Sequence, residues 1–389
     1  MPQSGANALR ITRLRLQNWL NFVDVEVCLA RRAFFVGPNA SGKSNLLDAL
    51  RFVRDLVTTG GGLQEAVRAR GGVTAIRCLA ARRFPQVSVE IDVGTEAHPT
   101  LWQYELGFTG GTGRTRQPEI GKEQIRRSGK TVLSRPDGAD EEDPERRRQT
   151  ALEQISANKE FRELANFFST IRYLHVVPQI IRDPRRGVGT DDPFGGDLLE
   201  RINTTSPRKR DARLRRMQEA LQIAVPQLAE LQLETDEKGI PHLKAKYQHW
   251  RPQGAWQREA QFSDGTLRLL GLIWALQEAG GPLLLEEPEL SLHPAVVREL
   301  PRMIHRATRS SGRQTFLTTH SADLLQDEGI GLDEVHLLVP GDNGTDVKTG
   351  ASIADVRRMV EQGVPLGEAM LPRAQAPNAA QLSLFDLVV

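Results

Sequence analysis

The residues Gly37-Pro-Asn-Ala-Ser-Gly-Lys-Ser44 are of types that bind phosphate when they stand at this spacing. The glycines let backbone N–H groups curl around phosphate oxygens, and a helix that starts there adds positive potential. The Lys43 ammonium would reach the β- and γ-phosphates of ATP, and the Ser44 hydroxyl would bind Mg²⁺. A glycine turn that merely begins a helix is the alternative. We assign nucleotide binding to Gly37, Asn39, Ser41, Gly42, Lys43, Ser44 and Asn45.

Two neighbouring carboxylates, Glu286 and Glu287, follow the apolar run 283–285. Such a run predicts a buried strand, and the ligands of parallel sheets bind at the C-terminal ends of strands. Adjacent strand residues point to opposite sides, so one carboxylate can serve Mg²⁺ while the next orients water. We assign Glu286 to the metal, through a water, and Glu287 to catalysis as the base. The alternative is an acidic surface turn.

The elements around these motifs predict an α/β protein with a parallel sheet and crossover helices. Residues 60–72 and 109–150 are predicted to be loops because glycine and charged residues dominate them. A helix over 208–232 must kink or break at Pro226. Further helices are predicted after Ser44 and at 150–170 and 267–279, and strands at 10–36, 87–93, 101–108, 172–177, 231–234, 242–247, 283–285, 315–318 and 335–339.

The composition of the 389 residues is that of a soluble globular protein, with 39% hydrophobic and 26% charged residues. No apolar run approaches the ~20 residues that cross a bilayer, and the first ten residues lack the apolar core of a signal peptide. Two cysteines exclude a disulfide framework. We expect a cytoplasmic protein with no membrane partner. The net charge of +2 does not by itself predict a nucleic-acid partner.

Four stretches, in this order, resemble an ABC-type ATPase head of the RecF/SMC/OLD-like branch. The first is the glycine loop at 37–44, and the second, Phe262-Ser-Asp-Gly-Thr-Leu-Arg268, is similar to the signature motif. Residues 286–294, Glu-Glu-Pro-Glu-Leu-Ser-Leu-His-Pro, look like the Walker B and D-loop segments, and Thr318-Thr-His-Ser321 resembles the switch-histidine segment. The resemblance covers residues 10–108 and 260–340. It implies an ABC-type P-loop ATPase head, a mixed sheet with an antiparallel subdomain, split by an inserted helical and β lobe.

The resemblance also implies a bacterial ATPase that forms a homodimer on ATP, with two nucleotides enclosed between two heads. Ser263, Asp264 and Gly265 would contact the nucleotide held by the other copy. His320 would contact the γ-phosphate and act in catalysis with Glu287 and Lys43.

The chain departs from the family pattern at three points. Thr266 stands where glutamine is common, and Glu286 stands where many relatives have aspartate. The Q-loop glutamine is unassigned, with Gln86 and Gln179 as candidates.

The long interval between Lys43 and Glu286 implies an insertion in the ATPase head. We therefore divide the chain into an N-terminal ATPase lobe at 1–109, an inserted lobe at 110–260 and a C-terminal ATPase lobe at 261–370. A flexible tail at 371–389 begins with a run rich in proline and alanine.

Two further stretches suggest partners. A basic run begins at Arg201 and suits contacts with DNA phosphates, although a solvated helix face balanced by nearby acids is nearly as good an explanation. The tail residues 381–385, Gln-Leu-Ser-Leu-Phe, resemble the peptide by which bacterial replication and repair proteins bind the sliding clamp; the alternative is a final strand packed on its own domain. The candidate DNA contacts are Arg208, Lys209, Arg210, Arg213, Arg215 and Arg216, and the candidate clamp contacts are Gln381, Leu382, Leu384 and Phe385.

Together these features predict an ATPase that acts on DNA in repair, replication or genome maintenance. One alternative is the sensor subunit of an anti-phage system with a separate effector. Another is an ATP-switched scaffold with negligible turnover, and a transporter subunit is disfavoured by the inserted lobe. No intrinsic nuclease is predicted, because the roughly fifty residues after Val339 hold no metal-binding acidic cluster.

Overall fold

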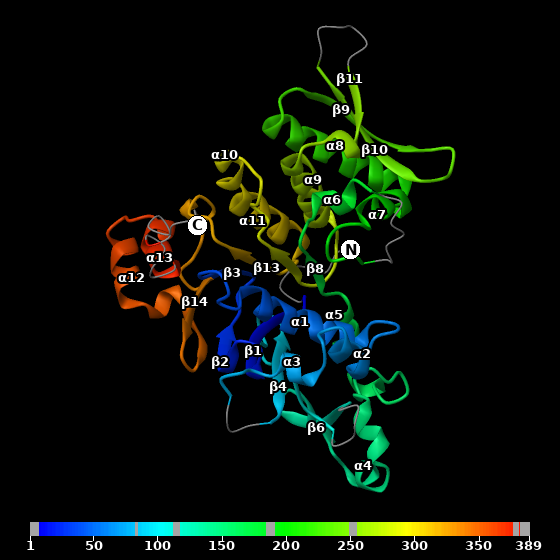
Figure 1. Ribbon diagram of the computed structural model, residues 1–389, viewed down its shortest axis with the longest axis vertical. Helices are drawn as coiled ribbons and strands as arrows, with labels where there is room; N and C mark the ends of the chain where they lie inside the picture. The colour runs from blue at the N-terminus through cyan, green and yellow to red at the C-terminus, as the bar shows by residue number, and fades with distance from the viewer. Residues whose placement is uncertain are drawn as a thin grey trace, which may run out of the picture.

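The computed structural model describes residues 8–81, 85–111, 117–183, 191–248 and 255–375, together with residue 381. Its strands form three sheets that helices cover (Figure 1). A central, mostly parallel sheet lies between an antiparallel sheet at one end of the long axis and a lobe with the third sheet at the other. This arrangement confirms the predicted α/β class, a mixed sheet with an antiparallel subdomain.

The central sheet joins segments from across the chain in the order β15-β14-β3-β13-β12-β8. Every pair is parallel except β14 with β15. All residues of β3 and β13 are buried, because parallel strands are covered on both faces. The strands predicted at 172–177, 283–285, 315–318 and 335–339, and at the end of 10–36, are confirmed in this sheet, and β15 is added to them. The bounds are β3 Arg32–Val36, β8 Arg172–Leu174, β12 Leu283–Glu286, β13 Thr315–Thr319, β14 Val335–Gly341 and β15 Gly344–Thr349.

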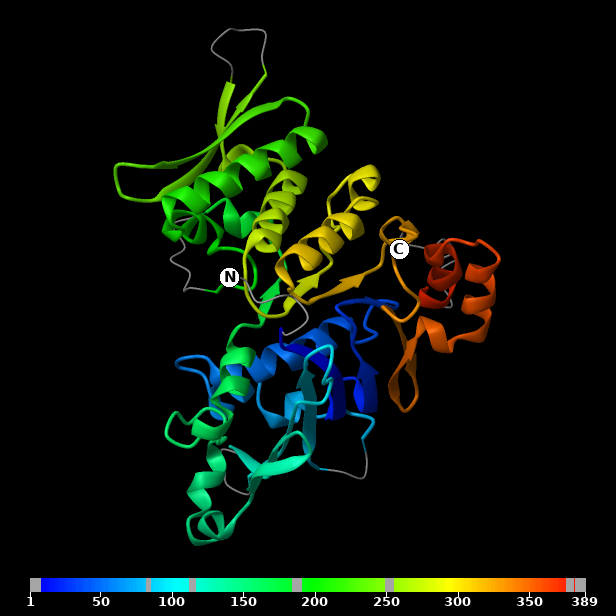
Figure 2. The ribbon, with the colours of Figure 1, turned by 180° about the vertical axis from the view of Figure 1, so that it is seen from behind.

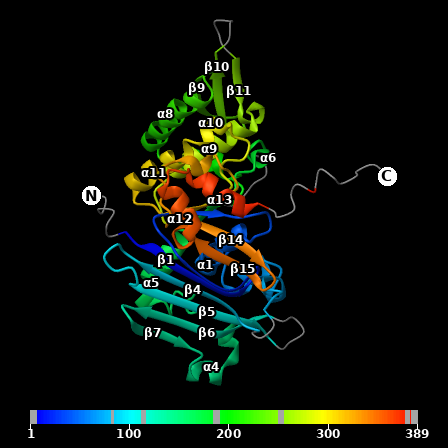
Figure 3. The same cartoon turned by 90° about the vertical axis from the view of Figure 1, so that its left-hand side faces the viewer.

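The antiparallel sheet has the order β2-β1-β4-β5-β6-β7, and Figure 3 shows β1, β4, β5, β6 and β7 next to one another. Two of its strands come from residues 109–150, so the prediction of exposed loops there is wrong. Charged residues and glycine mask the alternation, yet Ile120 and Ile125 are fully buried. The boundary predicted between residues 109 and 110 falls at the last residue of β5, which pairs with β6 in the same sheet. The bounds are β1 Arg10–Trp19, β2 Phe22–Cys28, β4 Val87–Gly94, β5 Trp102–Gly110, β6 Pro118–Arg127 and β7 Lys130–Arg135.

Helices cover both faces of the central sheet and build two cores. One core fills the space between α1 and the antiparallel sheet, and the other lies on the opposite face around α9 and α11. A short helix, α2, lies within the region predicted as loops at 60–72, and a second, α3, begins directly after it. Pro372, assigned to the flexible tail, lies inside α13. The bounds are α1 Lys43–Val57, α2 Leu63–Arg68, α3 Val73–Ile76, α4 Gly138–Glu142, α5 Arg162–Ser169, α6 Pro178–Ile181, α9 Asp264–Gln277, α10 Pro294–Val297, α11 Leu300–Ser311, α12 Ala354–Glu361 and α13 Leu366–Ala374.

The lobe at the far end of the molecule is a helix packed on a three-stranded sheet, and it is the upper part of Figure 2. The predicted helix at 208–232 ends at Ala224, ahead of Pro226. The strands predicted at 231–234 and 242–247 are β9 and β10, which pair as an antiparallel hairpin. The bounds are α7 Leu198–Thr204, α8 Pro207–Ala224, β9 Leu228–Thr235, β10 Pro241–Tyr247 and β11 Ala255–Arg258.

Ionic contacts tie the lobe to the head. Arg201 of α7 pairs at 2.9 Å with Glu278, the residue that follows α9, and Arg172 of β8 binds the same carboxylate. At the base of the lobe the Arg182 guanidinium donates to the carbonyl oxygen of Phe262 at 2.7 Å. The chain therefore leaves the head and returns to it at one point.

Candidate nucleotide site

The glycine loop joins β3 to α1, as its position between an apolar run and an amphipathic run predicts. Gly42 has φ +95°, a left-handed conformation that glycine adopts without strain. A side chain on Gly37 would lie 2.7 Å from Ser41 Oγ and 2.8 Å from the carbonyl oxygen of Leu338, so this position also requires glycine. The loop is thus closely fitted to its neighbouring strand β14.

The Lys43 side chain lies under the loop that precedes it. Its ammonium donates to the carbonyl oxygens of Gly37 and Pro38, at 3.0 Å each. Burial lowers the pKa of Lys43, and the nearby carboxylates of Glu287 and Glu286 oppose this effect. The cation is therefore buried at the place where the phosphates of a nucleotide would lie.

Ser44 and Glu286 meet across the junction of α1 and β12. Ser44 Oγ donates to Glu286 Oε1 at 2.5 Å, and burial raises the pKa of the Glu286 carboxyl. A hydroxyl and a carboxylate are the hard oxygen donors that Mg²⁺ prefers. The two residues assigned to the metal from the sequence are in contact, and their donor set fits that ion.

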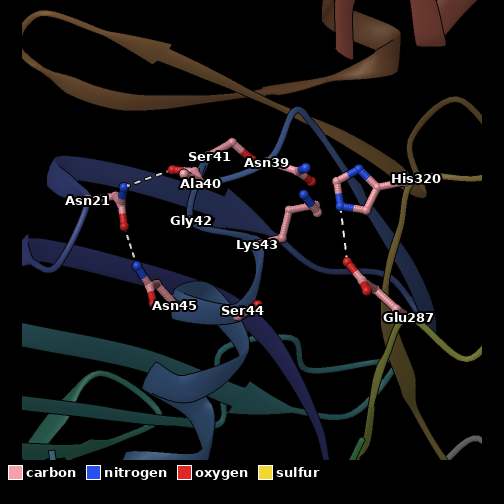
Figure 4. Close-up of a pocket in the computed structure, with 10 residues that line it drawn as sticks. All are labelled: Asn21, Asn39, Ala40, Ser41, Gly42, Lys43, Ser44, Asn45, Glu287 and His320. Atoms are coloured by element: carbon pink, nitrogen blue, oxygen red, sulfur yellow. Dashed lines mark hydrogen bonds and ion pairs between the residues drawn. The ribbon is translucent and has the colours of Figure 1, made fainter. Parts of the chain in front are cut away.

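Glu287 and His320 form the opposite wall of the site. His320 Nε2 and Glu287 Oε1 are 3.0 Å apart (Figure 4), and this hydrogen bond lowers the pKa of Glu287. The two glutamates diverge because Glu287 leaves the strand with φ +43°, not because strand residues alternate as the sequence argument assumed. Thr318 Oγ1 accepts from the Glu287 backbone N–H at 3.1 Å and holds this turn.

Lys43, Ser44, Glu287 and His320 line one cavity of about 290 Å³, and Glu286 and Gly37 lie outside its lining. Sequence reasoning missed Asn21, which enters from the turn between β1 and β2. Its amide donates to the carbonyl oxygen of Ala40 at 3.2 Å and accepts from Asn45. The only sequence signal was a polar residue between Leu20 and Phe22. The lining residues are Asn21, Asn39, Ala40, Ser41, Gly42, Lys43, Ser44, Asn45, Glu287 and His320.

Asn21 also lines a neighbouring hollow of about 570 Å³. Its walls come from the turn at Leu20, from the segment around Arg77 and Leu79, and from the β14–β15 hairpin at Thr345. Leu79 is 98% exposed, so an apolar side chain faces solvent beside the site.

The signature residues lie elsewhere. None of Ser263, Asp264 and Gly265 lines the cavity. Ser263 caps α9 and accepts from the Thr266 N–H at 3.2 Å, and Asp264 pairs with Arg182 at 2.5 Å. A side chain on Gly265 would lie 2.6 Å from the carbonyl oxygen of Ser291, so this glycine is also needed for packing within the chain.

Neither candidate Q-loop glutamine lines the cavity. Gln86 packs against Gly107 and Gly121 on the antiparallel sheet, where each glycine leaves room for its side chain. Gln179 lies on α6, with its amide nitrogen 3.5 Å from an Asp264 carboxylate oxygen.

The basic run divides into structural and exposed residues. Arg213 lies over the Trp274 ring, 5.1 Å from its centroid, and Arg210 pairs with Asp211 at 3.2 Å. Four others are exposed and have no ion pair with any residue that the structure describes: Arg208, Lys209, Arg215 and Arg216. Of the clamp-like residues, Gln381 is exposed, and Leu382, Leu384 and Phe385 lie outside the described residues.

The fold and this cavity define a P-loop ATPase domain. The chain belongs to the AAA-domain family described as "putative AbiEii toxin, Type IV TA system", whose pattern matches residues 32–326. This supports the ATPase part of the predicted resemblance and leaves the clamp-like tail untested. Within the described part of the chain, no helix is both long and apolar enough to span a membrane.

Other proteins share this domain. The chain is 38% identical over 90 residues to the chromosome partition protein Smc of Cereibacter sphaeroides, a match that takes in 22% of the chain but 7% of that protein. The Smc head bound to the C-terminal winged-helix domain of ScpA has a TM-score of 0.54 at 16% identity, over 87% of this chain and 97% of that one. A head with a coiled coil from Pyrococcus yayanosii has a TM-score of 0.51 at 13% identity, over 92% and 100%. The chain has the fold of an SMC head.

Proposed function

We propose that the chain hydrolyses ATP as a homodimer, with each nucleotide enclosed between two copies, and that it acts on DNA in a bacterial cytoplasm. One observation carries the dimer. The cavity is lined by residues 39–45 of the P-loop and by Glu287 and His320, and Glu286 contacts Ser44 without lining it. Ser263 and Gly265 of the same chain also lie outside it. A second copy would supply its signature residues to this cavity.

The residues have distinct roles in hydrolysis. The backbone of 37–44 and the Lys43 ammonium bind the β- and γ-phosphates. Ser44 and Glu286 would hold Mg²⁺, which neutralises phosphate charge when bound. Glu287 accepts a proton from the attacking water, a task for which its carboxylate is ionised at neutral pH. His320 stands beside it to contact the γ-phosphate, and the hollow beyond Asn21 has room for the nucleoside.

Glu287→Gln tests the ATPase proposal. Loss of a general base lowers kcat by roughly 10²–10⁴-fold, so the variant would bind ATP, hydrolyse it slowly and accumulate as a dimer. Light scattering after gel filtration with ATP and Mg²⁺ measures the dimer. Unchanged turnover in the variant would exclude Glu287 as the base. A wild-type chain that dimerises on ATP without turnover would support the scaffold alternative.

The exposed basic residues of α8 support DNA as the partner. Arg208 and Lys209 stand in the first turn of the helix, where no acid balances them and where the helix dipole disfavours cations. These cations destabilise their own helix, and the phosphates of a bound DNA backbone would neutralise them. ATP hydrolysis measured with DNA ends, gapped DNA and intact duplex tests this role and the structure recognised.

The family's description favours a second candidate. It names a putative toxin of a type IV TA system, which fits the ATPase subunit of a defence system better than a repair protein. Because we propose no nuclease in this chain, the effector would be a separate subunit. Co-purification of a second protein with the chain, and loss of host protection in a Lys43→Ala strain, would favour this candidate.

The clamp tether rests on residues 381–385 alone. Deletion of 381–389 would abolish binding to purified sliding clamp and leave ATP hydrolysis unchanged. Binding that survives the deletion would exclude the tether.

A further inference from the structure

Glu289 is a buried acid close to the nucleotide cavity, and it has no role in the hydrolysis proposed above. It follows Glu287 by two residues and is 8% exposed. It does not line the cavity, and one of its carboxylate oxygens, Oε2, is buried without a partner among the described residues. Burial raises the pKa of this carboxyl. A buried carboxylate costs folding free energy unless hydrogen bonds offset its loss of water.

The other carboxylate oxygen binds the loop that carries His320. Glu289 Oε1 accepts from Thr319 Oγ1 at 2.6 Å and from the His320 backbone N–H at 3.1 Å. A second hydrogen bond links the same two segments in the opposite direction: Thr318 Oγ1 accepts from the Glu287 N–H. Two bridges thus join the segment after β12 to the end of β13, one on each side of the contact between Glu287 and His320.

We propose that Glu289 is a positioning residue that fixes His320 against Glu287, so that this pair forms in one geometry. The proposal rests on the proposed ATPase function, and it adds a residue that acts through His320 and does not touch the nucleotide. Without the Oε1 acceptor, the His320 N–H and the Thr319 hydroxyl lose their partner, and the imidazole is no longer held 3.0 Å from the Glu287 carboxylate.

The experiment compares three substitutions. Glu289→Ala removes the acceptor, and we expect kcat to fall by about 10- to 100-fold, the cost of misplacing reactive groups by an ångström or less, with KM for ATP changed less than about twofold. Glu289→Gln keeps an acceptor oxygen of the same reach and would retain kcat within about threefold. Glu153→Ala is the matched control, because Glu153 also accepts from a threonine hydroxyl and a backbone N–H, those of Thr150 and Leu63, away from the cavity. The control would retain kcat.

A double-mutant cycle separates positioning from a general loss of stability. If Glu289 acts through His320, Glu289→Ala lowers kcat no further once His320→Ala is present. An equal fall in both backgrounds would overturn the proposal, as would a Gln variant as inactive as the Ala variant. Should Glu289→Ala fail to fold, Thr319→Val removes one of the two donors at nearly constant volume and takes its place in the cycle.

A spectroscopic measurement keeps the proposal testable if the wild-type chain has no turnover. In protein labelled with ¹⁵N-histidine, the ring signal missing from His320→Ala identifies His320. We expect Glu289→Ala to shift this signal and Glu153→Ala to leave it unchanged. Absence of hydrolysis would refute the proposed function alone, whereas an unmoved His320 signal would refute the positioning role.

Discussion

Ser44 and Glu286 are 242 residues apart in the sequence, and their side-chain oxygens are 2.5 Å apart in the fold. The contact exists because β3, which leads into α1, and β12 lie on either side of β13 in one parallel sheet. Their C-terminal ends therefore meet at one edge. The sheet, not local sequence, brings the phosphate loop to the acidic strand end.

Ser44→Ala tests the metal assignment. We expect the Mg²⁺ concentration for half-maximal turnover to rise about tenfold or more, the scale observed when groups that orient a metal ligand are removed. Titration of hydrolysis with Mg²⁺ at saturating ATP measures it. Ser88→Ala is the control, because the Ser88 hydroxyl on β4 is buried, has no partner in the described residues and does not line the cavity. An unchanged Mg²⁺ requirement in Ser44→Ala would contradict the assignment.

Gly265→Ala tests whether the signature glycine packs within the chain. The added methyl group would lie 2.6 Å from the carbonyl oxygen of Ser291, so we expect the nucleotide-free protein to lose about 1–3 kcal/mol of unfolding free energy. Urea unfolding measures the loss. Gly138→Ala is the control, because nothing lies within 4 Å of its added carbon. If both variants unfold alike, Gly265 is required only by the partner copy.

A pair of substitutions on α8 tests the DNA surface. Arg215→Gln with Arg216→Gln would weaken DNA binding and reduce the slope of log affinity against log salt by up to about 2. Arg306 and Arg309 are exposed arginines of α11, and their replacement by glutamine is the matched control. Equal losses in the two pairs would show that total charge, and not this face, governs binding. Arg213→Gln would instead reduce stability, because its guanidinium packs on Trp274.

His336 makes stability depend on pH. It is fully buried, neither ring nitrogen has a hydrogen-bond partner among the residues that the structure describes, and burial lowers its pKa to about 4 from 6.5. The unfolded chain therefore binds a proton more readily than the folded one, and the native state loses stability as pH falls from about 6.5 towards 4. The full loss is about 3 kcal/mol.

Urea unfolding at pH 7, 5.5 and 4.5 measures this effect as the difference between wild type and His336→Leu. Other titrating groups contribute to both proteins and cancel. His305→Asn, at an exposed position of α11, would follow the wild-type curve. A constant difference between wild type and His336→Leu at all three pH values would contradict the assignment.

The sequence predicts those parts of the site that depend on short stretches. The loop at 37–44 fixes its own conformation through glycine, and the apolar run before Glu286 requires a buried strand, so both motifs could be located without a structure. Asn21 could not be located in this way, because it joins the site only where a turn of the antiparallel sheet contacts Ala40 in the fold. The positive charge of the run around Arg213 could likewise be predicted. Which side of the helix packs on α9 could not. Strand β6 was missed because one of its buried positions holds a charged residue, Glu123, whose carboxylate pairs with Arg135.

Arg182 donates to the carbonyl oxygen of Phe262, 80 residues further along the chain. That contact closes the lobe into a loop whose ends are pinned to the head. The entropy of closing such a loop grows only slowly with its length, by about 0.6 kcal/mol for each doubling. A longer or shorter lobe could therefore be held by the same contacts with almost the same entropy of loop closure. The appendage is free to diverge in evolution while the start of α9 stays in register with the catalytic sheet.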